Sequence, residues 1–251
     1  MKKKILFIIS LIAKFWIFIP SKIRVYLFTF FYLLESRNKN AATGLKNLFK
    51  LKDKLEWVIN ERALSYGKNI HPKHKLTRYH NFFIDRINNG ETVLDVGCGY
   101  GAVARSIAKS KKLSTIYGID VDSEKINQAR SYEKLDNLFF IIGNAEREIN
   151  YKADVVVLSN VLEHISSRIE FLKNIRKSTN AKKFLIRVPM FERDWQIPLR
   201  RELKINYFSD DDHKIEHSIE EFKEEIETCD FVITYMSTIW GEIWAECISK
   251  S

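Results

Sequence analysis

The sequence of 251 residues is poor in cysteine, and the three that occur are not spaced to act together. They lie at positions 98, 229 and 247, and no C-x-x-C pair is formed. A disulfide framework needs several cysteines at regular spacings, and a structural zinc site needs paired cysteines or histidines. The sequence indicates neither of these, and it suits a reducing compartment such as the cytoplasm. It also lacks internal repeats and low-complexity segments.

Long uninterrupted apolar runs are lacking too, even near the hydrophobic N-terminus. Residues 5–19 are apolar with two exceptions, Pro20 ends the run, and a second apolar block covers 25–34. A spanning helix requires roughly 20 apolar residues, and a signal peptide requires a small-residue cleavage site, which does not follow. Basic and aromatic residues are interleaved instead, as in helices that lie in the interface of an anionic membrane. We therefore expect residues 1–40 to bind a membrane from the cytoplasmic side, peripherally or monotopically, with a spanning helix or a buried helical pair as alternatives.

Acidic residues are scarce in the first third of the chain. Residues 1–75 hold 16 Lys and Arg against 4 Asp and Glu, and residues 76–251 hold 25 against 28, so the net charge of +9 belongs to the first part. A nucleic-acid partner would require a basic groove on the main body, so we expect none. The composition predicts a membrane-associating segment at 1–40, a helical linker with lead-in helices at 41–90, and a body at 91–251.

Apolar and amphipathic segments alternate along the body. Strands are expected at 93–96, 114–120, 138–142, 154–159, 183–188, 231–237 and 242–248, with helices at 43–65, 76–87, 102–110, 123–132 and 220–228. This alternation predicts an α/β fold with a doubly wound, parallel sheet. In the lead-in segment, His74, Tyr79 and His80 are candidates for lining a site, with a structural role as the alternative.

The most informative stretch is VLDVGCGYGAVA, which places Gly97, Gly99 and Gly101 between the first strand and its helix. Such a loop lets a ligand approach the backbone and directs a helix N-terminus toward it. Together with Ala102 it also satisfies the dinucleotide pattern G-x-G-x-x-G/A. Asp95 separates the two interpretations, because a carboxylate there would repel a pyrophosphate and suits a cationic ligand. A purely structural turn with a capping Asp95 is the remaining alternative.

At these residues the sequence resembles the class I S-adenosylmethionine-dependent methyltransferases, whose first motif has this form. The resemblance covers residues 70–251. It implies a Rossmann-like, mostly parallel seven-stranded sheet in which the last two strands form an antiparallel closing pair. It also implies S-adenosyl-L-methionine as cofactor, bound by Asp95, Gly97, Cys98, Gly99, Gly101, Asp120, Val121, Asn144, Ala145 and Asn160.

The resemblance assigns roles to several of these positions. Asp95 would face the amino acid end of the cofactor, and Asp120, at the end of the second strand, would accept hydrogen bonds from the ribose hydroxyls. Asp122 is the nearby alternative, and Asp120 could instead cap a helix. Asn144 would meet the adenine amino group and Ala145 would donate a backbone amide to the ring. The alternative for Gly-Asn at this point is an ordinary turn.

The string SNVLEHI at 159–165 resembles the fourth motif of many small-molecule methyltransferases. In a subset related to quinone-biosynthesis O-methyltransferases, an E-x-x-E-H version binds a divalent metal. Here Asn160 replaces the first acid and leaves only Glu163 and His164, so no metal site is predicted. His164 is a candidate general base, with packing as the alternative.

Residues 191–217 follow the fifth strand, where family members carry substrate-recognition segments. A loop of this length is commonly a functional lid, and its mixture of Trp195, arginines, acids and histidines suits a hydroxylated acceptor such as a sugar. His213 is the first candidate for the general base. A solvated surface insertion is the alternative.

The sequence thus predicts a methyltransferase that acts on a small or glycan- or lipid-linked acceptor, at a hydroxyl, on the cytoplasmic face of the membrane. The strings FERDW and GEIW are similar to those of uncharacterised methyltransferases of surface-polysaccharide gene sets. Two other classes remain: a dinucleotide-dependent Rossmann enzyme, and a non-catalytic module tethered to the membrane.

Overall fold

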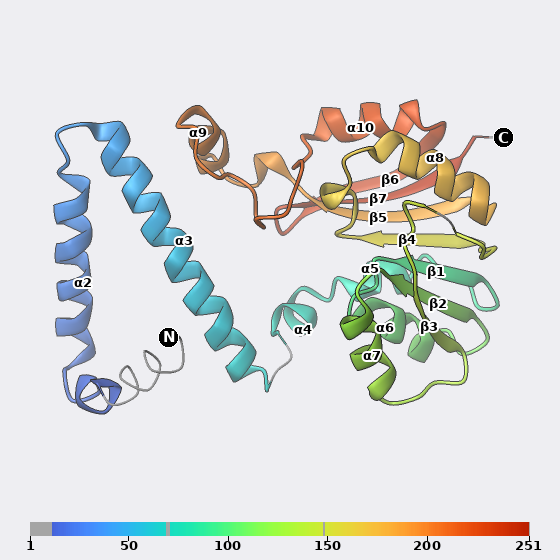
Figure 1. The fold of residues 1–251 in the computed structure, drawn as a ribbon, viewed down its shortest axis with the longest axis horizontal. Coiled ribbons are helices and arrows are strands. Elements are labelled where there is room, and N and C mark those ends of the chain that lie inside the picture. Colours follow the sequence, from blue (N-terminus) through green and yellow to red (C-terminus); the bar gives the residue numbers. More distant parts are fainter. Residues whose placement is uncertain (1–11, 69–70, 148, 251) are drawn as a thin grey trace. The chain divides into compact units, whose positions relative to one another are not determined.

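The computed structural model describes residues 12–68, 71–147 and 149–250. The chain divides into two compact units, Met1–Asn69 and Ile70–Ser251, each of which is shown in Figure 1. The boundary between the units falls inside the linker predicted at 41–90.

In the first unit, the helices α2 (Ser21–Ser36) and α3 (Ala41–Tyr66) run antiparallel and pack against each other. Pro20 precedes α2, and the Asn40 side chain caps α3 by accepting a hydrogen bond from the Thr43 amide at 3.1 Å. The helix predicted at 43–65 is therefore confirmed. Residues 5–11 of the first apolar run lie outside the described residues, and no helix within the described part of the chain is both long and apolar enough to cross a bilayer.

The second unit contains one seven-stranded sheet in the order β3-β2-β1-β4-β5-β7-β6. All neighbours pair in parallel except β7, which runs antiparallel to both β5 and β6. The strands are β1 (Thr92–Val96), β2 (Thr115–Asp120), β3 (Leu138–Ile142), β4 (Val155–Ser159), β5 (Lys183–Pro189), β6 (Phe231–Ile239) and β7 (Glu242–Ser249). The predicted doubly wound sheet and its antiparallel closing pair are confirmed.

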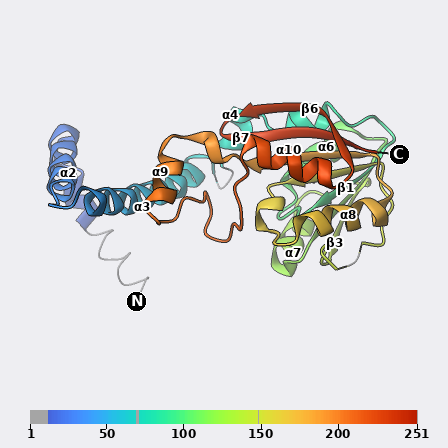
Figure 2. The same ribbon diagram turned by 90° about the horizontal axis from the view of Figure 1, so that it is seen from above.

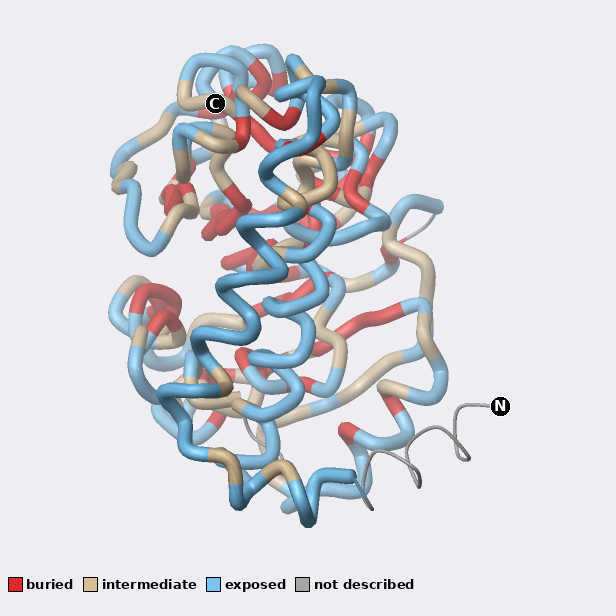
Figure 3. The backbone as a smooth tube through the Cα atoms, turned by 90° about the vertical axis from the view of Figure 1, so that its left-hand side faces the viewer, coloured by how far each residue is buried: buried red, intermediate tan, exposed pale blue. Residues whose placement is uncertain are grey.

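The core forms two layers, one on each face of the sheet, because successive residues of a strand point to opposite sides. Val93, Val155 and Val157 pack with α5 (His80–Ile84) and α6 (Ala102–Ser110) on one face. The residues between them, such as Leu94 and Val156, pack with the helices α8 (Arg168–Thr179) and α10 (Ile219–Thr228) on the other. Figures 2 and 3 show the covered sheet and the buried residues along its strands.

The remaining helices of the second unit are α4 (Lys73–Thr77), α7 (Ser123–Ser131), the 3-10 turns η1 (Leu162–His164) and η2 (Phe191–Arg193), and α9 (Gln196–Glu202). Of these, α7 packs against β2 and β3, and η1 and η2 follow the carboxyl ends of β4 and β5. The single helix predicted at 76–87 is wrong, because Arg78 adopts a left-handed backbone (φ 50°) and separates α4 from α5. The segment 191–217 also contains more regular structure than a plain loop, since it includes η2 and α9.

Candidate active site

The glycine loop leaves the carboxyl end of β1 and leads into α6. Gly97 and Gly101 have φ values of 65° and 75°, which favour glycine. A Cβ atom at Gly97 would lie 2.8 Å from Val161, and one at Gly101 would collide with the Phe140 ring. At Gly99, by contrast, a Cβ would meet no atom within 4 Å. The middle of the loop therefore faces open space, where a ligand can approach the backbone.

Asp95 lies beneath this loop with only 2% of its surface exposed. One carboxylate oxygen accepts a hydrogen bond from the Ala104 amide at 3.1 Å, so Asp95 anchors the first turn of α6. Burial raises the pKa of Asp95 to about 7; the Ala104 amide opposes this shift and the charge of Asp120 adds to it. Asp95 therefore does have the capping role that is the alternative for this residue. A cationic ligand beside it would favour the ionised carboxylate.

Asp120 and Asp122 have different partners. The Asp120 carboxylate accepts hydrogen bonds from the Gly99 amide at 2.8 Å and from the Asp122 amide at 2.9 Å. The Asp122 side chain caps α7 by accepting from the amides of Glu124 and Lys125. Asp120 therefore lies against the glycine loop, whereas Asp122 is the helix cap. Val121, between them, is an exposed apolar residue.

Asn144 and Asn160 follow the ends of β3 and β4. The Asn144 side chain accepts a hydrogen bond from the Glu146 amide at 2.9 Å, so it forms an ordinary turn, with half-buried Ala145 inside it. The Gly143 amide donates to the Asp120 carbonyl at 3.0 Å, which places this turn beside Asp120. Asn160 is in the left-handed region (φ 59°), and its buried side-chain oxygen makes no hydrogen bond. Strain and an unpaired polar atom at one position are typical of a ligand site.

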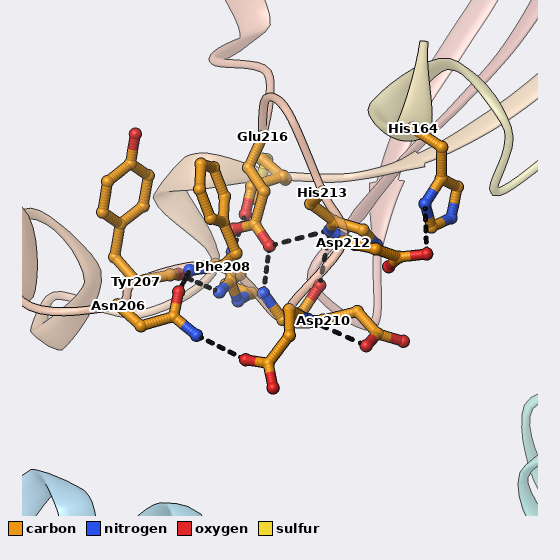
Figure 4. A network of polar contacts seen from close by, with 12 residues as sticks. His164, Asn206, Tyr207, Phe208, Asp210, Asp212, His213 and Glu216 are labelled. Atoms are coloured by element: carbon orange, nitrogen blue, oxygen red, sulfur yellow. Dashed lines mark hydrogen bonds and ion pairs between the residues drawn. The ribbon is translucent and has the colours of Figure 1, made fainter.

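The two predicted base candidates lie together although they are far apart in sequence. The rings of His164, in η1, and His213 are 4.7 Å apart and edge-to-face. His164 Nδ1 is 3.2 Å from an Asp212 oxygen, and His213 Nδ1 is 3.4 Å from Glu216, as Figure 4 shows. Burial, followed by the nearby charge of His164, lowers the pKa of His213, which favours the neutral imidazole that a base requires.

Glu163 completes this cluster and was not predicted as a site residue. Its side chain is fully buried, and neither carboxylate oxygen makes a hydrogen bond. Burial raises the pKa of Glu163 to about 8, against smaller opposing effects of its own amide, Arg187 and Asn160. The Glu163 carbonyl accepts from the Lys214 amide at 2.6 Å, which ties the segment 191–217 to η1.

The lead-in residues belong to a second polar cluster on the α5 and α6 face. Tyr79 Oη lies 2.8 Å from His74 Nδ1, and the Arg187 guanidinium stacks 4.0 Å from the Tyr79 ring. Arg187 also forms a bidentate ion pair with Glu242 at 2.5 and 2.6 Å. Sequence reasoning missed both partners of this pair, although an arginine inside the apolar strand FLIRVP was a visible signal.

Burial of Tyr79 raises its pKa to about 12, and the nearby carboxylates of Asp95 and Glu242 add to this shift while Arg187 opposes it. His80 Nδ1 lies 2.7 Å from the Ser106 hydroxyl of α6. These lead-in side chains are therefore packed near the buried Asp95. Trp195 belongs instead to the segment 191–217, and its side chain is open to solvent, at 72% exposure.

A doubly wound sheet with a glycine loop after β1, a buried acid before the loop and a second acid at the end of β2 defines an enzyme class that binds nucleoside-containing cofactors. A family profile described as a methyltransferase domain matches residues 66–235. The chain belongs to this family, and the predicted resemblance to S-adenosylmethionine-dependent methyltransferases is confirmed.

Individual relatives are distant. A ribosomal protein L11 methyltransferase of Thermotoga petrophila is 29% identical over 127 residues, which cover 49% of this chain and 46% of that protein. A mitochondrial ubiquinone biosynthesis O-methyltransferase of Saccharomyces cerevisiae is 28% identical over 113 residues, covering 41% and 34%. The chain thus spans about half or less of the length of these curated relatives.

A solved structure with the same fold is the magnesium protoporphyrin IX methyltransferase of Synechocystis PCC 6803 with bound SAH. Its TM-score is 0.55 at 14% identity, and the match covers 71% of this chain and 83% of that one. At this identity the likeness establishes the fold alone.

Proposed function

We propose that this protein transfers a methyl group from S-adenosylmethionine to a hydroxyl of a small or glycan- or lipid-linked acceptor. The observation that carries the proposal is the open glycine loop between two acids, Asp95 below it and Asp120 beside it. A family profile over two thirds of the chain supports the reaction class. The curated relatives include both an O-methyltransferase and a protein methyltransferase. The choice of a hydroxyl as the methylated group is therefore argued from the residues of the site.

The residues at the strand ends fit the cofactor. The backbone of Gly97, Cys98, Gly99 and Gly101 would approach it closely, and ionised Asp95 would attract its ammonium group. Asp120 would accept from the ribose hydroxyls, with Val121 against the adenine. Asn144, Ala145 and Asn160 would line the opposite side, and the unpaired oxygen of Asn160 would gain a donor there. The cofactor supplies an activated methyl group on a sulfonium.

The acceptor would bind beside the cluster of Glu163, His164 and His213, because η1 follows β4, whose end adjoins that of β1. Val161, at the start of this turn, lies against Gly97 and so links the cluster to the glycine loop. His213, kept neutral by burial, would accept the hydroxyl proton, and His164 is the second candidate. The segment 191–217 would select the acceptor and exclude water.

The first unit suits attachment to a membrane surface. No residue of α2 is buried, and its exposed side chains include Ile23, Val25, Phe28, Phe30 and Phe31. Such an apolar surface preceded by basic residues is typical of helices that enter the interface of an anionic bilayer. The acceptor would then be presented at the cytoplasmic face.

Methyl transfer from labelled S-adenosylmethionine to lipid and glycan fractions of cell envelopes tests this proposal. We expect the full chain to label such a fraction and His213→Ala to lower turnover by about 10²–10⁴ with normal cofactor binding, as for a lost base. His71→Ala, outside the cluster, is the matched control. Unchanged turnover in His213→Ala with the true acceptor would end its assignment.

A further inference from the structure

Three side chains of the acceptor cluster are arranged like the ligands of a metal ion. One carboxylate oxygen of Glu163 and one ring nitrogen each of His164 and His213 all lie within 4.8 Å of one another. Two ligands bound to zinc at 2.0–2.1 Å with tetrahedral angles would be about 3.4 Å apart. The observed separations, at most 4.8 Å, exceed this spacing by no more than about 1.4 Å.

The buried carboxyl of Glu163 is the second observation that points to a cation. Both of its oxygens are enclosed and have no partner in full hydrogen-bond geometry, although its own amide and the Asn160 side chain lie near enough to lower its pKa. A buried carboxyl group in this state costs free energy unless a partner is supplied. His164 and His213 offer it only ring nitrogens. A metal ion among these three groups would provide the missing partner and favour the ionised carboxylate.

The two imidazoles are held by carboxylates on their other sides. His213 Nδ1 faces Glu216, which is fully buried and is itself bound by Arg193 and the Ser209 amide. His164 Nδ1 faces Asp212. Metal-binding histidines usually have such a carboxylate on the nitrogen that does not coordinate, since it fixes the tautomer and the ring orientation. Because Nδ1 of each ring faces a carboxylate, Nε2 is the nitrogen that would coordinate the ion.

We propose that Glu163, His164 and His213 bind a divalent transition-metal ion of the zinc type. Asn160 at the position of the first acid argued against a metal, but His213 supplies another ligand from a segment outside that motif. The Lys214 amide fixes that segment to the Glu163 carbonyl at 2.6 Å. Two imidazoles and one carboxylate favour zinc over magnesium or calcium, which prefer oxygen ligands.

The chemical consequence of the ion rests on the proposed methyl transfer. The ion would make a bound acceptor hydroxyl more acidic, so the hydroxyl would release its proton to solvent as the acceptor binds, before water is excluded, and its oxygen electron pair would then form the bond to the methyl carbon. The electron pair of the broken carbon–sulfur bond stays on sulfur. The histidines then act as ligands, and the ion takes over the acidification assigned above to His213.

Calorimetric titration of the metal-free full chain with zinc chloride, and with magnesium chloride for comparison, tests the site. We expect one zinc per chain, no magnesium binding, and losses of zinc affinity above about 100-fold in Glu163→Gln and His213→Ala, since outer partners alone cost roughly 10–100-fold. Asp211→Asn is the matched control, because it changes charge in the same segment but belongs neither to the three proposed ligands nor to Asp210 and Asp212, whose carboxylates lie near His213. Visible absorption of the cobalt(II) form provides an independent readout of nitrogen coordination.

No zinc binding by the wild-type chain, or equal zinc affinity in the wild type and both variants, would overturn the proposal. Thermal melts identify a variant that fails to fold, and His164→Ala then serves as the alternative. S-adenosylmethionine binding is measured on the same samples. Zinc bound without S-adenosylmethionine would contradict the methyltransferase function and leave the metal site standing.

Discussion

At the scale of single residues, Asp95 is a buried acid, and burial makes its ionised form unfavourable until a cationic ligand binds beside it. Its pKa of about 7 in the folded chain lies above the ordinary value of 3.8, because the carboxyl is buried. Between these values the unfolded chain releases the proton and the folded chain keeps it. Stability is therefore lost as the pH rises through this window.

We expect the free energy of unfolding of the ligand-free protein to fall from about pH 4 to about pH 7, with a contribution from Asp95 of up to about 1.4 kcal/mol per pH unit. Asp95→Asn, which can still accept from the Ala104 amide, should flatten this slope. Urea titrations at several pH values measure it. An unchanged slope in Asp95→Asn would show that its carboxyl does not titrate in this range.

Asp120 and Asp122 are two residues apart and should give separable effects. Asp120→Ala should lower S-adenosylmethionine affinity roughly 10–100-fold through lost charge-assisted hydrogen bonds. It should also lower stability by about 1 kcal/mol, because its carboxylate holds two loop amides. Asp122→Ala should reduce stability through the lost cap of α7 and leave affinity unchanged. Calorimetry and thermal melts compare the two variants. If Asp120→Ala bound S-adenosylmethionine as tightly as Asp122→Ala, the ribose role of Asp120 would be contradicted.

At the scale of elements, the pair Arg187–Glu242 joins β5 to the antiparallel strand β7. Both side chains are largely enclosed, at 9% and 17% exposure. Removing one partner would leave a buried charge alone, so Glu242→Ala should cost roughly 3–5 kcal/mol of stability. Glu133→Ala, which breaks the exposed pair with Lys109, should change stability little. If denaturant titrations gave equal losses of unfolding free energy for Glu242→Ala and Glu133→Ala, the role of burial would be contradicted.

The sequence predicts the sheet well because its strands are short apolar runs that alternate with amphipathic helices. The resemblance then assigns the glycine loop, Asp120 and SNVLEHI to the ends of successive strands of that sheet. Arg78 shows where local patterns fail, since a left-handed residue divides a helix that the periodicity predicts as one. Its neighbour Tyr79 is drawn into the core and stacks on Arg187, a contact that spans more than one hundred residues of chain.

The candidate site is predicted in part for the same reason. Residues that follow a strand are placed by the sheet, so Asp95, Asp120 and Asn160 could be found from spacing. The approach of His213 to Glu163 and His164 depends on how the segment 191–217 folds back, through the Lys214 amide and the Arg193–Glu216 pair. No local pattern encodes those contacts.

At the scale of the whole molecule, the basic first unit and the acidic body should have separable functions. Deleting residues 1–40 should abolish flotation with anionic vesicles and leave cofactor binding intact. High salt should weaken binding of the full chain only partly, because buried apolar area remains. Phe28→Ser with Phe31→Ser should weaken it further than Lys22→Gln. Flotation of the deletion variant at the level of the full chain would contradict the membrane role of this segment.

The central claim is that the glycine loop binds S-adenosylmethionine and not a dinucleotide. Calorimetric titration of the full chain with S-adenosylmethionine, its demethylated product and NAD⁺ tests it most directly. The account predicts one site per chain for the first two ligands, weakened in Asp120→Ala, and no binding heat for NAD⁺, since Asp95 opposes a pyrophosphate. Binding of NAD⁺ without binding of S-adenosylmethionine would contradict it.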